Sequence, residues 1–356
     1  RELVHDDVRL TMGGEPTFVS TEKPDAPEWN FTAVSPEKRV LSAELLRRLV
    51  SRFAPGALLH YGQGKWYPGE VLPRYALCAF WRKDGVPVWQ DLSLIADESR
   101  DYGYGLEEAK SLAARLAELL GLSPEFLLPG YEDALYYAWR ESRLPANVKA
   151  DELKAGTPEE RARLQKIFTS GMLKEVGYVL PLAHLNGRWQ TGRWHLRNEG
   201  GLWLIAGDSP MGLRLPLDAL PWAEAADMPS NTPEDPTQSQ PPLPESFCFP
   251  LPAPSVKERV AGAGRHRKPA VGESAKHLVR TALCVEPRHG RLHVFLPPVQ
   301  SAQAYLQLVA AVEGAARELG TPVVIEGETP PFDARLNKLG VTPDPGVIEV
   351  NLHPSA

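Results

Sequence analysis

Two glutamates lie within runs of β-branched, strand-forming residues, where a charge is unexpected. Glu326 occurs in the run PVVIEGE and Glu349 in the run VIEVN. An unpaired carboxylate is costly to bury, so a cationic group is expected to meet each of these side chains.

A third acidic residue, Glu15, is presented by an unusual local sequence, LTMGGEPTFV. The two glycines before it allow close backbone approaches, and Pro16 pushes Glu15 toward an extended conformation. The pattern predicts a carboxylate held at a rigid kink. An ordinary Gly-Gly turn with an exposed glutamate has the same sequence signature.

The strand that contains Glu349 has a polar face. Because side chains alternate along a strand, Glu349, Asn351 and His353 lie on one side, opposite Ile348 and Val350. Oxygen and nitrogen donors at this spacing are a plausible ligand row for Mg²⁺ or Mn²⁺. An edge strand with its polar face toward water fits the same pattern equally well.

Two further segments carry candidate groups. His293 interrupts the apolar run RLHVFLPP, where a lone histidine is more often structural than catalytic. Residues 60–70, HYGQGKWYPGE, form a glycine-rich loop around Lys65 that could contact a substrate carboxylate or a nucleotide, or could be an aromatic-anchored surface loop. The spacing is not that of a phosphate-binding P-loop. The hydrolase, HExxH metalloprotease and dinucleotide-binding motifs do not occur in the sequence either.

Composition limits the class of protein. The chain has 356 residues, 43% of them hydrophobic, a net charge of −6 and a pI near 5.9. Such a charge argues against a nucleic-acid-binding protein, and no apolar run reaches the roughly 18 residues of a membrane span. The three cysteines are widely separated, which favours neither a disulfide framework nor a zinc site and is typical of a reducing, cytoplasmic compartment.

The sequence divides into two structured blocks, 1–221 and 257–356, on either side of a proline-rich linker or loop at 222–256. Nine prolines occur within residues 229–254, a composition that does not build a core. Helices are expected over 36–53, 106–120 and 302–319 from their caps and apolar spacing, with two more over 131–142 and 157–168.

Strand signals complete the expected fold. They include a hairpin around Asp84-Gly85 and another around His289-Gly290, and a strand over 322–328. The second block therefore reads as hairpin, helix, strand, strand. We predict an α+β fold with a mostly antiparallel sheet and helices on one face.

Several long segments together resemble a known family. They are LTMGGEPTFVS, PEKR, LLHYGQGKWYPGE, WRKDGVPVW, HVFLPP, PVVIEGE and VTPDPGVIEVNLHP, which run from near the start of the chain to its end. The chain is similar to the bacterial putative amidoligase family, a domain of unknown function (DUF2126) often fused to a transglutaminase-like domain. That family is grouped with glutamine synthetase and glutamate-cysteine ligase.

The resemblance implies an activity and a site. It implies a glutamine-synthetase-like fold and an ATP-dependent ligase that joins a carboxylate to an amine of a peptide or amino acid, with Mg²⁺ or Mn²⁺. The implied residues are Glu15, Glu326 and Glu349 as metal ligands within one concave surface, Lys65 and Arg74 as catalytic cations, and His293 and Asn351 as cofactor contacts.

The resemblance also implies neighbouring segments. Family members have a transglutaminase-like region upstream and a glycine-rich segment downstream of the part that matches, so this chain is expected to be a fragment that does not turn over ATP alone. Two other functions fit the residues: a noncatalytic partner module of a transglutaminase-like protein, and a metal-dependent amide hydrolase.

Overall fold

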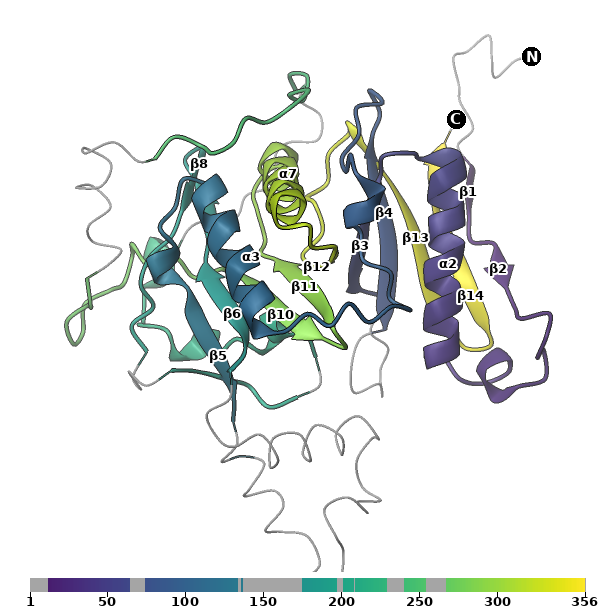
Figure 1. Ribbon diagram of the computed structural model, residues 1–356, viewed down its shortest axis with the longest axis horizontal. Helices are drawn as coiled ribbons and strands as arrows, with labels where there is room; N and C mark the ends of the chain where they lie inside the picture. Colours follow the sequence, from purple (N-terminus) through teal and green to yellow (C-terminus); the bar gives the residue numbers. More distant parts are fainter. Residues whose placement is uncertain are drawn as a thin grey trace, which may run out of the picture.

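A computed structural model describes residues 12–64, 74–133, 136, 175–196, 201–207, 209–228, 240–253 and 267–355. Its α-helices are α2 (Pro36–Phe53), α3 (Leu106–Leu119) and α7 (Ala302–Leu319) (Figure 1). Its strands are β1 (Met12–Gly14), β2 (Thr17–Phe18), β3 (Leu58–Gln63), β4 (Tyr75–Arg82), β5 (Leu128–Glu132), β6 (Glu175–Pro181), β7 (Ala183–Leu185), β8 (Arg188–Gln190), β9 (Leu202–Leu204), β10 (Ala282–Arg288), β11 (Arg291–Leu296), β12 (Val323–Gly327), β13 (Leu336–Asp344) and β14 (Val347–Ser355).

One large sheet organises the described part of the chain. It has 12 strands in the order β1-β14-β13-β4-β3-β12-β11-β10-β6-β5-β9, with β2 paired to β14. Neighbours are antiparallel except at β11/β12, β12/β3 and β5/β9. The expected mixture of helices with a mostly antiparallel sheet is confirmed. The parallel β11/β12 pair arises because α7 carries the chain from the end of β11 back to the start of β12.

The helix ends follow their sequence signals. Ser35 accepts a hydrogen bond from the Lys38 amide at the start of α2, with Pro36 in the first turn. Ser301 caps α7 in the same way, and Gly320 ends it in the left-handed conformation. None of the helices in the described residues is long and apolar enough to cross a membrane. The helices expected at 131–142 and 157–168 lie almost wholly outside those residues.

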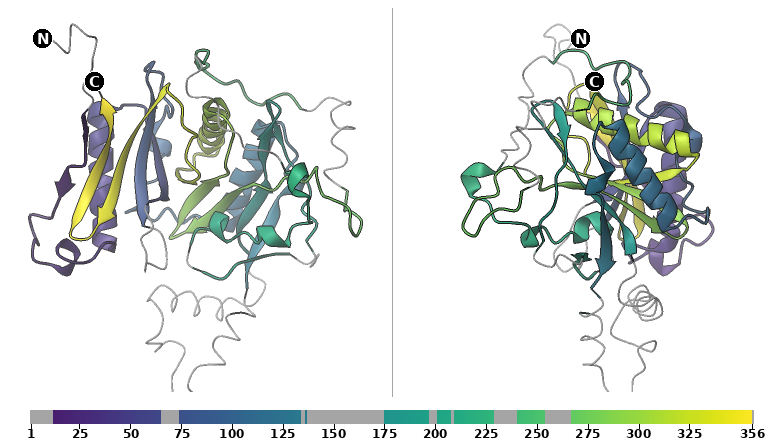
Figure 2. Two further views of the ribbon diagram at one scale, coloured as in Figure 1. Left: turned by 180° about the vertical axis from the view of Figure 1, so that it is seen from behind. Right: turned by 60° about the vertical axis from the view of Figure 1, so that its left-hand side comes forward.

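The helices cover opposite faces of the sheet. α2 packs against the face that carries Leu59, Tyr61 and Val341, whereas α3 and α7 pack against the face that carries Leu58 and Ile325. The expectation of helices on one face is therefore wrong. A sheet of this many strands twists strongly, so the face that α2 covers in one half is not the face that α3 and α7 cover in the other half. Figures 1 and 2 show α2 beside β13 and β14, and α3 beside β6.

Strands from both sequence blocks interleave in this sheet. β3 and β4 come from the first block, yet β12 and β13 of the second block lie on either side of them. The described part of the proline-rich segment, 240–253, packs on the same body: Leu243 is buried and Leu251 donates its amide hydrogen to the Leu119 carbonyl. This part is an ordered loop held by contacts.

The two expected hairpins have different outcomes. β10 and β11 form the hairpin at His289-Gly290, where both residues have positive φ angles of 51° and 68°. No strand follows the Asp84-Gly85 turn, so that hairpin is wrong. Instead β13, which the sequence pattern did not reveal, pairs with β4, while the amides of Val88 and Trp89 donate to the Gly56 carbonyl.

Arg82 provides a test of how the proline-rich loop is held. Its buried guanidinium donates to the carbonyls of Leu243 and Pro244 and to the Asp84 carboxylate. We expect Arg82→Met to lower the free energy of unfolding by about 1.5–3 kcal/mol, the usual contribution of hydrogen bonds to a charged group. Urea denaturation measures the loss, and proteolysis within 240–253 should become faster. The neighbouring exposed Lys83→Met is the control, and an equal loss there would contradict this role of Arg82.

Candidate active site

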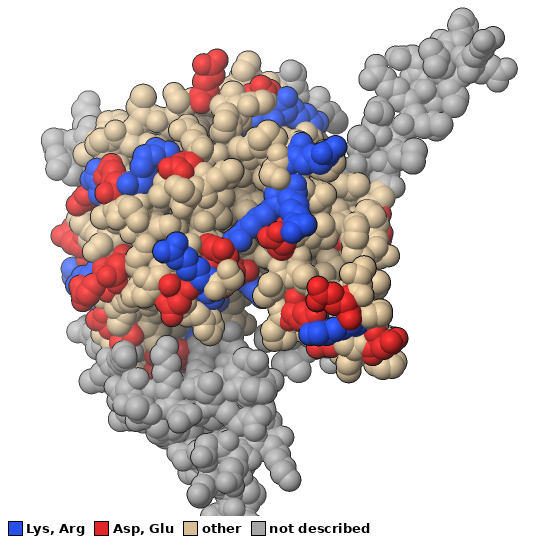
Figure 3. Space-filling view, turned by 45° about the vertical axis from the view of Figure 1, so that its right-hand side comes forward, with Lys and Arg blue, Asp and Glu red and all other residues tan. Residues whose placement is uncertain are grey.

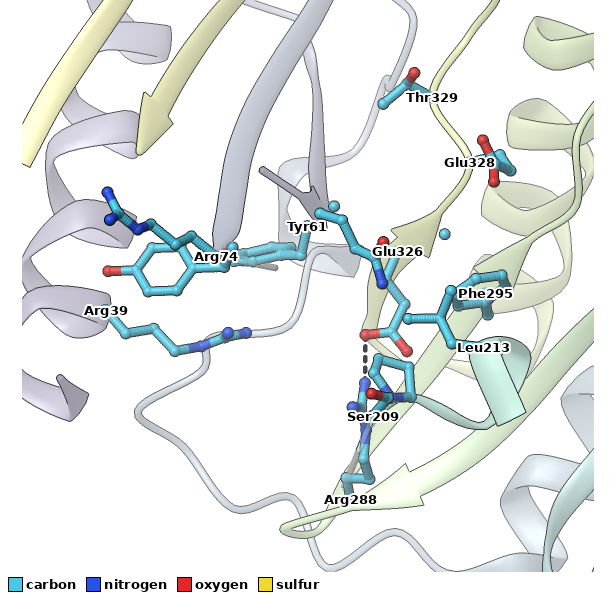
Figure 4. A pocket seen from close by; sticks show the side chains of 15 residues that line it. Arg39, Tyr61, Arg74, Ser209, Leu213, Arg288, Phe295, Glu326, Glu328 and Thr329 are labelled. Carbon is cyan, nitrogen blue, oxygen red and sulfur yellow. Dashed lines mark hydrogen bonds and ion pairs between the residues drawn. The ribbon is translucent and has the colours of Figure 1, made fainter. Parts of the chain in front are cut away.

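A pocket of about 390 Å³ opens where three neighbouring parallel strands end. β11, β12 and β3 run in the same direction, and residues at their carboxyl ends, among them Phe295, Glu326 and Gly62, line the pocket (Figure 4). The carboxyl edge of parallel strands is where ligands commonly bind in sheets of mixed helices and strands. This pocket is therefore the candidate active site.

Glycine keeps the strand end open. Gly327, directly after Glu326, has a φ of 101°, and a Cβ there would lie 2.5 Å from the Leu296 carbonyl oxygen. At Gly62 on β3 a Cβ would come within 3.1 Å of the His60 ring. Only glycine fits the first of these positions without movement of the backbone.

The floor of the pocket is a buried ion pair. The Glu326 carboxylate accepts through Oε2 from the Arg288 guanidinium, and His293 Nδ1 lies 3.3 Å from the same oxygen. Glu326 Oε1 is buried and has no hydrogen-bond partner among the described residues. One oxygen of the carboxylate is thus held by the protein, and the other is left for a ligand.

The contact with Arg288 also fixes the histidine. His293 Nδ1 lies 2.7 Å from Arg288 Nη2, and a guanidinium can only donate, so Nδ1 accepts. Burial, followed by the charge of Arg288, lowers the pKa of His293, so the ring is neutral near pH 7. A neutral ring that accepts at Nδ1 carries its proton at Nε2.

Electrostatics keep Glu326 ionised. Burial is the largest single influence and alone would raise the pKa of this carboxyl group, but the charge of Arg288, the contact with His293 and the hydrogen bond from Arg288 together outweigh it, and the pKa is lowered to about 2. A second buried carboxylate, Glu286, accepts from the Met211 amide at 2.7 Å and lies 3.6 Å from Arg288 Nε. Two carboxylates therefore lie beside one guanidinium.

The opposite wall is cationic and aromatic. The Arg39 guanidinium on α2 lies 5.8 Å from the Tyr61 ring centre and 5.5 Å from that of Tyr75. Figure 4 shows Arg39 reaching toward Glu326 and Arg288. The Arg39 side chain is 40% exposed and pairs with Glu98 at 2.8 Å, so a ligand can reach it. Figure 3 shows Lys and Arg side chains gathered near the middle of one face, with acidic side chains directly beside them.

A third wall is apolar. Pro210 and Leu213 face the pocket together with Phe295 of β11. The Met211 amide holds their segment in place by donating a hydrogen bond to Glu286. The backbone at Gly212 packs so closely on Phe295 that a Cβ there would lie 2.1 Å from the ring. The pocket thus combines a floor that contains a buried carboxylate, a cationic wall and an apolar wall.

The structure brings together three of the residues expected from the sequence. Arg74 and Glu326 line the pocket, and His293 lies against Glu326. Arg74 forms an ion pair with Asp344 and is almost fully buried. Lys65 lies outside the described residues.

The structure does not bring Glu15 and Glu349 to this pocket. Glu349 lies on β14, four strands from Glu326 in the sheet, a separation of about 19 Å at the usual strand spacing. The two side chains also point to opposite faces of the sheet. Glu326 lies on the same face as Tyr61, the residue it pairs with on β3, and Ile348 packs in the same apolar cluster as Tyr61. Glu349 follows Ile348 along β14 and therefore points to the other face. Glu15 is exposed beside β14. The expectation that the three carboxylates share one concave surface is wrong.

The polar row on β14 is likewise distant from the pocket. Asn351 donates a hydrogen bond to Thr342 on β13 at 2.9 Å, and the side chain of His353 lies outside the described residues. Within the described ranges, no group of three His, Cys, Asp or Glu side chains could hold a metal ion.

Sequence reasoning missed Arg39 and Arg288. A signal for Arg288 was present, because Glu286 and Arg288 alternate with apolar residues along β10, as Glu326 does along β12. Arg39 carried no such signal, since its place at the pocket depends on how α2 packs across the sheet.

The family was identified by comparison with known proteins. The whole chain, residues 1–356, matches the sequence model of a family described as "Putative amidoligase enzyme (DUF2126)". No curated protein and no solved structure matches the chain significantly. The glutamine-synthetase-like fold accordingly stays a prediction.

The buried ion pair predicts a pH dependence of stability. Because the pKa of Glu326 is lowered to about 2 on folding, the unfolded chain binds more protons below its ordinary pKa of 4.5. The stabilisation is therefore complete above pH 4.5 and is lost as the pH falls toward 2. We expect the stability difference between the native protein and Glu326→Gln to shrink by on the order of 3 kcal/mol over that range.

Denaturant titrations at several pH values measure this difference. Glu328→Gln, an exposed substitution in the same pocket, is the control. A Glu326→Gln difference that stays constant from pH 5 to pH 2 would show that Arg288 does not stabilise the ionised carboxylate.

Proposed function

The chain belongs to the putative amidoligase family (DUF2126), and from this premise we propose that it is an ATP-dependent ligase that joins a carboxylate to an amine. The substrate that we propose is a peptide or an amino acid.

The observation that carries the proposal is the pairing of opposite charges in one pocket. Forming an amide from a carboxylate requires cations for the activated carboxyl group and for the transferring phosphoryl group. Arg39 and Arg74 line one wall, and the unpartnered Glu326 Oε1 lies at the floor. A zwitterionic peptide or amino acid is complementary to this arrangement, and its side chain can lie against Leu213 and Phe295.

The chain's own residues take distinct roles in this proposal. Arg39, which is partly exposed, binds the negative charge of a carboxylate or phosphate group. Tyr61 is neutral, because burial raises its pKa to about 12, so it packs against Arg39 without adding charge. ATP would supply the phosphoryl group that turns the carboxylate into a group an amine can displace.

The residues fit a nucleotide better than a protein-held metal centre. Three guanidinium groups, of Arg39, Arg74 and Arg288, line the pocket, whereas Glu326 is the one buried carboxylate among its described lining residues. A site of Glu15, Glu326 and Glu349 does not fit, and no step is derived through it. Mg²⁺ or Mn²⁺ held mainly by the phosphates of ATP needs few protein ligands, and we propose the metal in that form.

The other two functions have less support. A metal-dependent amide hydrolase needs a ligand set that the described residues do not assemble. A noncatalytic partner module would not need a buried, unpartnered carboxylate facing a cationic wall. Association with a transglutaminase-like domain in a longer polypeptide stays a prediction from the resemblance.

The test is release of ADP with a panel of peptides and amino acids. It is measured with residues 1–356 and with the chain extended through the expected glycine-rich segment, and we expect release from the longer chain. Arg39→Ala should lower kcat/KM about 10- to 100-fold, the usual effect of losing a hydrogen bond from a charged group.

Arg48→Ala provides a matched control on the same helix, because Arg48 is 77% exposed and pairs with Glu44. Its activity should equal that of the native protein. Equal losses in the two variants, or no carboxylate-dependent ADP release from either length of chain, would count against the proposed function.

A further inference from the structure

Glu98, which lies behind the cationic wall of the pocket, carries an inference about how that wall works. We infer that Glu98 is a positioning residue, which holds the Arg39 guanidinium over the pocket so that it can donate to a carboxylate or phosphate oxygen of a ligand. Glu98 itself does not line the pocket and acts through Arg39. This inference rests on the proposed function and adds a residue that no sequence motif indicated.

The contact between the two side chains is an ion pair at one oxygen only. Arg39 Nη2 donates to Glu98 Oε1 at 2.8 Å, whereas Glu98 Oε2 is buried and has no hydrogen-bond partner among the described residues. Arginine and carboxylate groups often pair through two parallel hydrogen bonds. Here the guanidinium is turned away from that geometry, and Figure 4 shows it pointing toward Glu326 and Arg288. Part of its donor set therefore faces the pocket.

Two aromatic rings hold the same guanidinium. Arg39 Cζ lies 5.8 Å from the ring centre of Tyr61 and 5.5 Å from that of Tyr75. Tyr61 is buried, and the Tyr75 hydroxyl lies 3.3 Å from the Ser42 hydroxyl on α2, so both rings are fixed. A ring face attracts a cation but does not select which N–H group points outward. The hydrogen bond to Glu98 makes that selection.

The backbone of Glu98 is fixed without the help of its side chain. Its carbonyl accepts from Arg291 at 2.6 Å. On the preceding residue, the Asp97 carboxylate accepts from the Ser99 amide at 2.9 Å and from Arg47 at 3.2 Å. A substitution at position 98 therefore removes the contact with the guanidinium and leaves the loop in place.

The charge of Glu98 has the opposite effect on ligand binding. A carboxylate beside Arg39 repels an incoming anion, so if charge alone mattered, removing Glu98 would tighten the binding of an anion. If Glu98 positions Arg39, its removal lets the guanidinium leave the pocket, and binding weakens. Arg39 is 40% exposed, so solvent screens the repulsion, whereas a released arginine side chain adopts many rotamers. We expect the positioning effect to be the larger one.

Two substitutions separate these effects in binding measurements on residues 1–356. Glu98→Gln keeps an oxygen that accepts from Arg39 and removes the charge, whereas Glu98→Ala removes both. The calorimetric probes are N-acetylalanine, which offers a carboxylate, and inorganic tripolyphosphate, which offers phosphate oxygens. The probe whose affinity falls in Arg39→Ala identifies the anion that Arg39 receives. For that probe, Glu98→Ala should weaken binding about 10-fold, and Glu98→Gln should leave it equal or tighter.

A double-mutant cycle tests whether Glu98 acts through Arg39. In the Arg39→Ala background, Glu98→Ala should have no further effect, whereas independent effects would multiply. Glu44→Ala is the matched control, because Glu44 pairs with another arginine of α2, Arg48, outside the pocket lining, and it should leave both affinities unchanged. If Glu98→Ala does not fold, Glu98→Met fills the same space without an acceptor oxygen and gives the same comparison.

The ADP-release assay supplies a readout that a purely structural role would not change. We expect Glu98→Ala to raise KM about 10-fold for the substrate whose probe depends on Arg39, and Glu98→Gln to restore most of the loss. A role in folding alone would lower the fraction of active enzyme, and with it kcat, and would leave KM unchanged.

Several outcomes would overturn the inference. They are unchanged or tighter binding in Glu98→Ala, an equal loss in Glu98→Gln, a further loss in the Arg39→Ala background, probe affinities that do not depend on Arg39, or binding of neither probe by the native chain. Absence of ADP release together with the expected pattern of affinities would instead reject the proposed ligase and support the role of Glu98. The two hypotheses therefore fail separately.

Discussion

The arrangement of the pocket depends on the buried contact between Arg288 and Glu326. The two residues come from β10 and β12, and His293 on the strand between them contacts both. Burying a charge is unfavourable unless it is paired, so each of these side chains needs the others to stay ionised or correctly oriented. The pair thereby fixes the strand ends relative to one another and leaves one carboxylate oxygen for a ligand.

The rest of the fold brings distant segments to this ion pair. α7 connects β11 to β12 and makes them parallel, so their carboxyl ends meet at one edge with that of β3. α2 crosses the other half of the sheet and brings Arg39 over Tyr61. The segment around Met211 closes the apolar wall because Glu286, a neighbour of Arg288, accepts from its amide. The apolar wall is thus tied to the same buried network as the floor.

The geometry changes the expected chemistry of the site. Three carboxylates in one cleft would have indicated a metal centre, but two of them lie at the far side of the sheet. The pocket instead pairs one ionised carboxylate with arginines, an arrangement suited to a zwitterionic substrate and to phosphate charge. The proposed amide ligation fits this distribution, and the family to which the chain belongs agrees with it.

The sequence by itself determined the features that depend on neighbouring residues along the chain. Ser35 with Pro36, Ser301 with Gly320, and the His289-Gly290 turn act within a few residues, and each specified its element correctly. The charge of Glu326 in an apolar run likewise indicated a buried ionic partner before that partner was known. The tertiary structure alone decided which strands pair, which faces the helices cover and which charges meet. Alternation gives two faces to every strand but does not say which one lines a pocket, so Glu349 and Glu326 looked equivalent until the sheet put them on opposite sides.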